Sequence, residues 1–362
     1  MLTPLLALAL FVPQEAEKRT DIDVVFCIDC SGSMRQIIES AKQKVWSIVN
    51  ELAKAQPTPN LRIGLLGYGD QTRVIHRIDL TDDLDALYEQ LMKVQAEDIG
   101  DEWVGWAIGR SVAEMGWSES GAALRIVFVL GNETARQGPA EDDFTVTAPA
   151  AIDKDIIVNA IYCGQGNEEE LDTWREFSRL AEGSFTSIDI SGGVVSIATP
   201  HDKEIADLNT KLNGTYVAYG KLGRERKEKQ EAQDANAQQS GGGTASERAQ
   251  SKAGKLYKNS DWDLVDASDD ETFKIEEVKD EDLPENMRSM TLDEKKAHVA
   301  KNKEDRAGIQ KQIQDLGKKR QAFVDEEIKK QNLDASKGFD RVIQKTLREQ
   351  AAKKNFTFEE QP

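Results

Sequence analysis

The chain has 362 residues and a formal charge of −18, from 47 basic and 65 acidic residues. Its length exceeds that of most single domains, so one sizeable core plus an additional region is expected. Residues 221–362 hold 29 basic and 30 acidic residues, which leaves 18 and 35 in residues 1–220 and a formal charge of −17 there. This acidic part disfavours nucleic acid and anionic lipid as partners, and it favours cations and basic protein surfaces.

The N-terminus carries an apolar run, residues 2–12, that is too short to span a bilayer and is followed at once by polar residues. This pattern predicts a signal peptide over residues 1–17, and hence a periplasmic or secreted protein. A buried N-terminal strand is the alternative. No later apolar run approaches membrane length, so no transmembrane segment is expected.

Three cysteines are too few for a disulfide framework. Cys27 lies inside an apolar run and is predicted to be a buried thiol. Cys30 and Cys163 both fall at predicted strand ends, and an oxidising compartment leaves a bond between them open.

Between residues 21 and 190, short β-branched runs alternate with segments of helical period, which indicates a parallel sheet covered by helices. The predicted strands are 24–29, 62–68, 74–79, 124–130, 156–163 and 184–188. The link 69–73 is too short for a crossover helix, so strand 74–79 should run antiparallel at the sheet edge. Helices are expected over 34–52 and from 84, the second with Thr81 as N-cap. The fold class is therefore α/β: a doubly wound, mostly parallel sheet with one antiparallel edge strand, within a domain of residues 20–200.

The remaining residues are predicted to be mostly helical. Residues 201–285 form a polar satellite region with a helix at 203–212, a link or helix break at 240–244, and strand-like segments 215–219 and 262–265 that could pair. Residues 286–362 form a helical C-terminal region. There Thr291 and Glu294 make a capping-box pattern, and a second helix, about 336–354, should fold back on the first. The apolar stripe is sparse for a coiled coil, and self-association through these helices is a further expectation.

The chemistry concentrates where strand 24–29 ends, at Asp29, Ser31 and Ser33. In a doubly wound sheet, ligands bind beyond the strand C-termini, so this carboxylate and these two hydroxyls can converge there. Such hard oxygen ligands suit Mg²⁺, Mn²⁺ or Ca²⁺. The alternative is that both serines cap the helix that begins near Met34.

The D-x-S-x-S pattern after an apolar strand resembles the metal-ion-dependent adhesion site of von Willebrand factor type A domains. That resemblance implies a threonine or aspartate from a second loop and an aspartate from a third. Asp101 is the fourth predicted ligand, preferred over Glu102. Asn132 stands where the family has its third-loop aspartate, with Glu133 next to it, so lower metal affinity is expected. The predicted metal ligands are thus Asp29, Ser31, Ser33, Asp101 and Asn132.

Enzymatic interpretations fit less well. A haloacid dehalogenase-like phosphatase needs an aspartate where Ser31 stands, and a serine hydrolase needs a base that His76, His201 and His298 do not supply. The resemblance therefore predicts an exported, non-enzymatic binding protein. Its cation, preferably Mg²⁺ rather than Mn²⁺ or Ca²⁺, would capture an Asp or Glu of a protein partner. The alternatives are a structural scaffold with a weak or metal-free domain, and a chelatase-type subunit, against which export argues.

Overall fold

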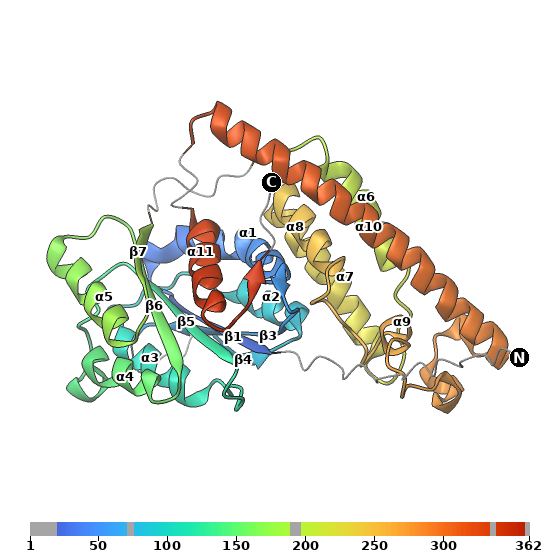
Figure 1. The fold of residues 1–362 in the computed structure, drawn as a ribbon, viewed down its shortest axis with the longest axis horizontal. Helices are drawn as coiled ribbons and strands as arrows, with labels where there is room; N and C mark the ends of the chain where they lie inside the picture. The colour runs from blue at the N-terminus through green and yellow to red at the C-terminus, as the bar shows by residue number, and fades with distance from the viewer. Residues whose placement is uncertain (1–19, 71–75, 189–196, 334–337, 359–362) are drawn as a thin grey trace, which may run out of the picture.

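The computed structural model describes residues 20–70, 76–188, 197–333 and 338–358, and the predicted signal peptide lies outside them. A twisted sheet with helices on both faces forms one side of the molecule, and a second group of helices, which includes the long α10 (Leu292–Lys330), forms the other (Figure 1). Residues 197–333 build that helical group, whereas the last helix returns to the sheet.

The sheet has six strands in the order β4-β3-β1-β5-β6-β7. Their bounds are Asp21–Asp29 (β1), Asn60–Tyr68 (β3), His76–Thr81 (β4), Leu124–Gly131 (β5), Ile156–Cys163 (β6) and Phe185–Ile188 (β7). Neighbouring strands are parallel except β3 and β4, which pair antiparallel at the edge. The predicted fold class, including its antiparallel edge strand, is confirmed.

Side chains of β1 alternate between two buried layers, as the period of a strand requires. Val24 and Phe26 face α1 (Arg35–Leu52) and α2 (Leu84–Lys93). Val25 and Cys27 face the helices of the opposite layer, α3 (Val104–Glu114), α4 (Phe144–Ile152) and α5 (Glu168–Leu180). Because both faces are covered, the central strands are apolar almost throughout.

One detail of this domain differs from the sequence-based expectation, and another answers a question that the sequence left open. The side chain of Asp83, not that of Thr81, caps α2 by accepting a hydrogen bond from the Ala86 amide at 2.8 Å. Cys27, Cys30 and Cys163 are all buried and free, so the bond between the last two is not formed.

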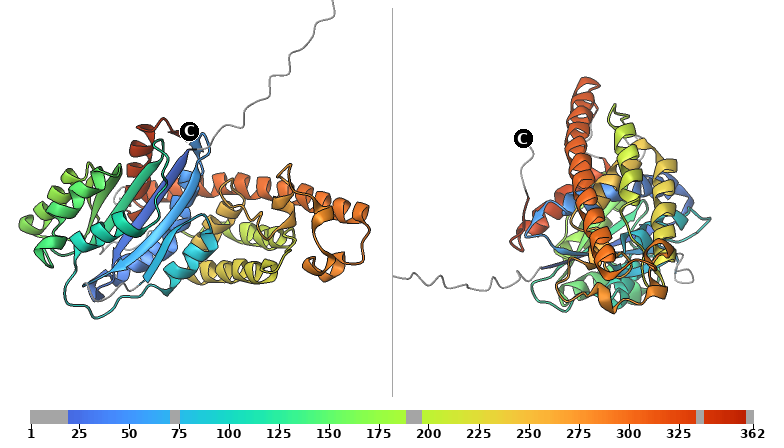
Figure 2. Two further views of the ribbon diagram at one scale, coloured as in Figure 1. Left: turned by 90° about the horizontal axis from the view of Figure 1, so that it is seen from below. Right: turned by 90° about the vertical axis from the view of Figure 1, so that its right-hand side faces the viewer.

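Four helices form the helical group beside α1 and α2 (Figure 2). They are α6 (Asp202–Asn213), α7 (Gly223–Ser240), α8 (Gly242–Lys252) and α10 (Leu292–Lys330). Gly241, at a φ of +127°, separates α7 from α8, which confirms the predicted helix break. The capping box of Thr291 and Glu294 opens α10 as predicted. In the described part of the chain, no helix combines the length and apolar character needed to cross a bilayer.

The strand-like segments of the satellite region do meet, but they form no sheet. A single antiparallel bridge joins Ala218 to Asp263, next to α9 (Leu264–Ala267). It is flanked by backbone hydrogen bonds from Tyr219 to Trp262 at 2.8 Å and from Leu264 to Val217 at 2.9 Å. A small third core lies beneath it, together with the short turns η4 (Ile275–Glu277), η5 (Asp280–Asp282) and η6 (Glu285–Met287).

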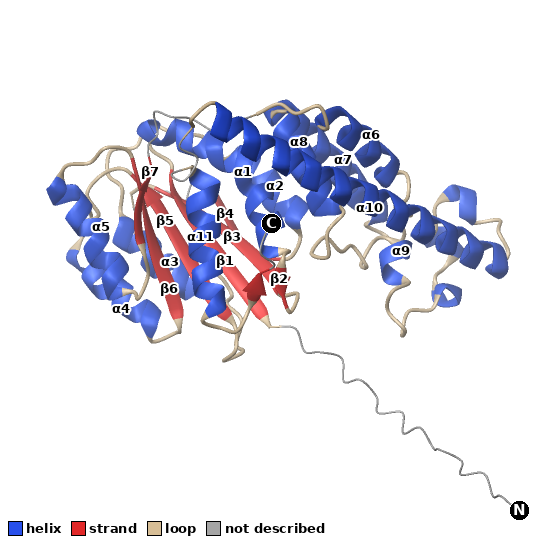
Figure 3. Ribbon diagram, turned by 45° about the horizontal axis from the view of Figure 1, so that its top comes forward, coloured by secondary structure: helices blue, strands red, loops and turns tan. Residues whose placement is uncertain are grey.

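The last helix, α11 (Phe339–Ala352), corrects one prediction: it packs on α1 and the sheet and does not fold back on α10 (Figure 3). Its apolar face is fully used there, with Ile343 and Leu347 completely buried. The side chains of Gln350 and Asn159 hydrogen-bond each other, and β8 (Thr357–Phe358) pairs with β2 (Ala55–Gln56). The strongly amphipathic α11 gains more from covering the sheet than from the charge-rich α10.

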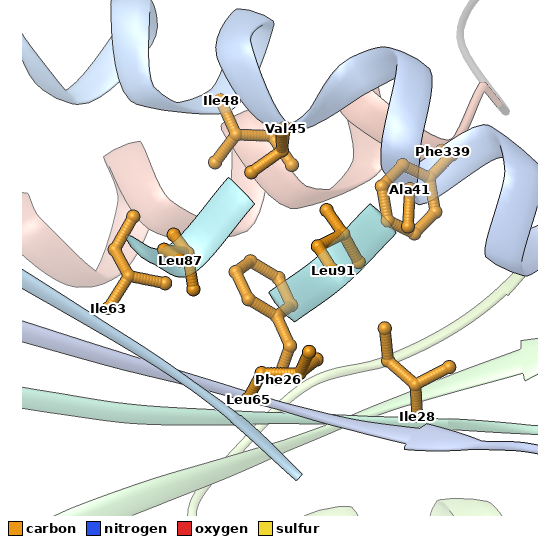
Figure 4. A pocket seen from close by; sticks show the side chains of 10 residues that line it. All are labelled: Phe26, Ile28, Ala41, Val45, Ile48, Ile63, Leu65, Leu87, Leu91 and Phe339. Atoms are coloured by element: carbon orange, nitrogen blue, oxygen red, sulfur yellow. The ribbon is translucent and has the colours of Figure 1, made fainter. Parts of the chain in front are cut away.

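An apolar cavity of about 20 Å³ lies between the sheet, α1, α2 and α11 (Figure 4). The lining side chains are Phe26, Ile28, Ala41, Val45, Ile48, Ile63, Leu65, Leu87, Leu91 and Phe339. A cavity this small and this apolar stays dry and has no room for a ligand of more than a few atoms. The polar chemistry of the domain lies elsewhere, at the carboxyl ends of the strands.

Candidate metal centre

The first loop of the site begins at the last residue of β1, the fully buried Asp29. The Ser31 backbone amide donates to Asp29 Oδ1 at 2.7 Å, and the Ser31 hydroxyl donates to Oδ2 at 3.1 Å. The chain then turns into a short 3₁₀ segment, Gly32–Met34 (η1), that leads into α1. Both carboxylate oxygens of Asp29 are thus held by the loop that follows the strand.

The serines also connect this loop to the end of β5. The Ser31 and Ser33 hydroxyl oxygens lie 2.9 Å apart, and the Ser33 hydroxyl donates to Asn132 Oδ1 at 3.1 Å. Neither serine side chain caps η1 or α1. The helix-capping alternative is therefore wrong, because the hydroxyls turn toward one another and toward the next strand.

The second loop turns Glu102 toward Asp29 and leaves Asp101, the predicted ligand, facing solvent. Asp101 is exposed, whereas Glu102 is 3% exposed and its carboxyl lies close enough to Asp29 and Ser31 for both to affect its pKa. Residues 101–103 are not helical, and α3 begins only at Val104. Adjacent side chains of such an extended segment point in opposite directions, so Glu102 faces Asp29 while Asp101 faces solvent.

Burial is the main cause of unusual acid strengths in the centre. It raises the pKa of Asp29 to about 6, although the hydrogen bonds from Glu102 and Ser31 oppose the rise. It raises the pKa of Glu102 to about 9, with the neighbouring Asp29 charge as the second cause. Two carboxyl groups in one dry site cannot both ionise without a compensating positive charge, so without a cation the pair shares a proton.

The third loop is fixed from beneath by aromatic side chains. The Tyr162 hydroxyl donates to the Asn132 carbonyl at 2.7 Å, and the Trp174 indole donates to the Glu133 carbonyl at 2.7 Å. Gly131 has no room for a side chain, since an added Cβ would lie 2.8 Å from the Tyr68 hydroxyl and 2.9 Å from Trp174. The Asn132 amide is therefore presented by a rigid support.

A glutamine joins the second loop to the third. The Glu102 backbone amide donates to Gln137 Oε1 at 2.7 Å, and Gln137 Nε2 donates to Glu133 Oε2 at 2.9 Å. Sequence reasoning missed Gln137, Tyr162 and Trp174, because residues that act through a backbone carbonyl or a neighbouring loop leave no spacing signal.

The centre unites four of the five predicted ligands, Asp29, Ser31, Ser33 and Asn132, and adds Glu102. Among the described residues, no three His, Cys, Asp or Glu side chains form a metal-binding group. The donors are instead two carboxyls, two hydroxyls and one amide oxygen. This all-oxygen set fits a hard divalent cation and not a thiolate-bound metal.

Comparisons with known proteins agree with this fold. The family profile of the von Willebrand factor type A domain matches residues 23–184. No curated protein matches the chain. BatB from Bacteroides thetaiotaomicron is a similar solved structure, at 17% identity and a TM-score of 0.36, covering 46% of this chain and 90% of BatB.

Two further structures cover much less of their own chains. Proximal thread matrix protein 1 from the mussel byssus, in a form whose metal-ion-dependent adhesion site is occupied by zinc, is 16% identical with a TM-score of 0.39. The match covers 48% of this chain and 43% of the mussel protein. A von Willebrand factor type A protein from Catenulispora acidiphila is 16% identical with a TM-score of 0.36, covering 48% and 40% of the two chains.

The strand order, the antiparallel edge, the loop cluster at the end of β1 and the family match over residues 23–184 agree with one another. This chain carries a von Willebrand factor type A domain.

Proposed function

We propose that this protein is an exported, non-enzymatic binding module that holds a divalent cation and uses it to capture a carboxylate of a protein partner. The proposed ligands are Asp29, Ser31, Ser33, Asn132 and Glu102. Domains of this family are protein-interaction modules that often bind divalent cations.

One observation carries the proposal: the centre has more hydrogen-bond acceptors than protons to fill them. The hydroxyls of Ser31 and Ser33 carry two protons between them but take part in three oxygen–oxygen contacts, to Asp29, to each other and to Asn132. The third contact therefore requires either the proton that Asp29 and Glu102 share or a cation in its place. In the described part of the chain, no lysine or arginine forms an ion pair with Asp29 or Glu102. A divalent cation would replace that proton and balance the charge of both carboxylates.

The oxygen donors favour Mg²⁺ as the ion, with Mn²⁺ and Ca²⁺ as competitors. Two carboxylates balance its charge, and the Asn132 amide adds an oxygen without charge. Binding should therefore be weaker than in a site with a third carboxylate.

The exposed side of the centre indicates the direction from which a further ligand of the cation would approach. Asp29 and Glu102 are buried, whereas Ser33 is exposed and Asn132 is half-buried. A ligand from outside thus approaches over Ser33 and Asn132. An Asp or Glu side chain of a partner is the hard, charged oxygen donor that a divalent cation accepts from that direction.

The function is tested by recovering partners of the immobilised full chain from an extract of its source cells, in Mg²⁺ and in chelator. We expect specific proteins to be retained only in Mg²⁺, and to be lost with Asp29→Ala but not with Asp153→Ala, a control at the opposite end of the sheet. The same proteins retained in chelator and by Asp29→Ala would contradict the proposal.

Assembly through the helical group is a second proposed role, and the length of α10, 39 residues, favours it. Phe323, Val324 and Ile328 near its end are only half-buried. Because α11 covers the sheet, removing everything after Thr291 would also damage the domain. Light scattering of Phe323→Ser is the cleaner test: loss of an oligomer supports assembly, and a monomer already in the unsubstituted protein excludes it.

A further inference from the structure

We propose that the partner segment captured at this centre is cationic around its single carboxylate, because the loops that surround the centre form an acidic rim. The inference rests on the proposed function and adds the charge character of the partner. The acidic rim is defined here by Asp98, Asp101 and Glu133.

The second loop supplies most of the rim. Residues 95–103 contain four acidic residues and no lysine or arginine. Glu102 turns inward to Asp29, and the Glu97 amide donates to the Cys30 carbonyl at 2.8 Å, which ties the loop against the start of the centre. Asp98 and Asp101 are both exposed. The loop therefore closes one side of the centre with one carboxylate and presents two others to solvent.

The third loop continues the rim on the other side. Glu133 is exposed beside Asn132, and Gln137 fixes its carboxylate at 2.9 Å. Its negative charge is felt in the centre, since it is among the causes that raise the pKa of Asp29 and of Glu102. Glu133 thus lies close enough to act on any charge that approaches the cation.

Among the residues that the structure describes, the cations near the centre do little to offset the rim. Arg136, in the third loop, is paired with Glu176 at 2.7 Å and with Asp143 at 3.5 Å. Arg175 on α5 is paired with Glu168 and Asp172. Arg35 is exposed at the start of α1 and, within the described ranges, sets one positive charge against the three negative charges of the rim.

The charge balance then selects the partner. A divalent cation is neutralised by ionised Asp29 and Glu102, so it no longer attracts a carboxylate from a distance. An incoming Asp or Glu meets the field of the rim, which repels it. Lysine or arginine next to that carboxylate reverses the sign of the encounter, because charges of opposite sign steer association and like charges suppress the wrong partners.

The test uses three synthetic peptides with one central aspartate between glycines, flanked by lysines, by serines or by glutamates. Each is titrated onto the full-length protein in Mg²⁺, at low and high ionic strength, and again in chelator. We expect the lysine-flanked peptide to bind on the order of tenfold more tightly than the serine-flanked one at low salt, with the difference shrinking at high salt. The glutamate-flanked peptide should bind weakest.

Matched variants separate the rim from overall charge. Asp98→Asn with Asp101→Asn removes two rim charges and should narrow the difference between the peptides. Glu119→Gln with Asp153→Asn removes two exposed charges at the opposite end of the sheet and should leave the difference unchanged. An equal effect of both variant pairs would overturn the role of the rim.

Two further outcomes would also test the proposal. Equal binding of the lysine and serine peptides, including no binding by either, would contradict the proposal that the partner segment is cationic. Metal binding is measured separately, so the proposed metal centre could still be correct in that case. Lysine-peptide binding that persists in chelator and in Asp29→Ala also overturns the inference, since it would show an acidic surface that acts without the cation.

Discussion

The α/β domain and the helical group hold their interiors together in different ways. The central strands of the sheet bury apolar side chains on both faces, and the stacked rings of Phe26 and Phe128 lie at their middle. The helical group instead buries charges: Arg248 is 1% exposed and Lys252 is completely buried. The first region is specified by apolar pattern and shape, and the second by the exact pairing of charges.

The charge network of the helical group also joins it to the domain. Arg248 of α8 lies 2.8 Å from Asp85 of α2 and 2.5 Å from Asp234 of α7, which Lys252 also contacts at 2.8 Å. These cations hold the pKa of Asp234 well below its usual range. A buried network of this kind stabilises little relative to an apolar core, but it strongly penalises the loss of one partner.

Arg248→Met is therefore expected to have the largest effect on stability. It leaves Asp85 and Asp234 buried next to an apolar side chain, and we expect the free energy of unfolding to fall by about 3–5 kcal/mol in denaturant titrations. Arg224→Met, at an exposed position of α7, should change it by less than about 0.5 kcal/mol. Similar small losses for both variants would show that charge pairing does not hold the helical group.

The apolar counterpart is Ile343→Ala on α11, with an expected loss of about 2–5 kcal/mol from the removed methyl groups and the cavity they leave. Leu333→Ala, at an exposed position outside the sheet contact, serves as the control and should cost far less. If Ile343→Ala were as mild as Leu333→Ala, α11 would not be part of the domain core.

The same contrast explains how much of the fold could be predicted. Alternating and continuous apolar runs predict the six strands to within a few residues, and the short link after β3 predicts the antiparallel edge. The apolar period of α11 indicates that one face is buried, but not that it covers the sheet. That placement depends on contacts between residues distant in sequence, such as Gln350 with Asn159.

At the centre itself, Asn132→Asp sharpens the account by adding a third carboxylate next to Ser33. We expect metal affinity to rise by about tenfold, since charged oxygen ligands tune divalent-ion affinity. Calorimetric titration with Mg²⁺ measures the change, and Asn132→Ala should shift it the other way. An affinity that does not respond to either substitution would place the ion elsewhere.

The protonation of Asp29 and Glu102 should have a smaller effect, on the pH dependence of stability and of metal affinity. Asp29 and Glu102 have pKa values raised to about 6 and about 9, so the folded protein without a cation holds protons that the unfolded chain has already lost. Their contribution to stability is fully present below the unfolded pKa values near 4 and is lost as pH rises through the folded ones. A cation must displace these protons, so its apparent affinity should rise between about pH 6 and pH 9.

Titrations in buffers of different ionisation enthalpy measure that proton release directly. We expect Glu102→Gln to abolish the release above pH 7, because Glu102 is the group that is still protonated there. Release that is unchanged in Glu102→Gln would assign the proton to another group.

The sequence motif predicts the whole first loop of the centre, since Asp29, Ser31 and Ser33 lie close together in sequence and the end of one strand is enough to bring them together. It also placed Asn132 correctly at the end of β5. It selects Asp101, whereas the structure turns Glu102 toward Asp29, because the facing of these two acids depends on whether the chain is extended or helical just before α3.

The central claim, that Asp29 and Glu102 help to hold a divalent cation, is tested most directly by calorimetry with Mg²⁺, Mn²⁺ and Ca²⁺. The four proteins to compare are the unsubstituted chain, Asp29→Ala, Glu102→Gln and Asp101→Asn. We predict a saturable heat for the unsubstituted chain and for Asp101→Asn, none for Asp29→Ala, and a weakened one for Glu102→Gln. Equal heats in the unsubstituted chain and Asp29→Ala, or no heat in either, would contradict the account.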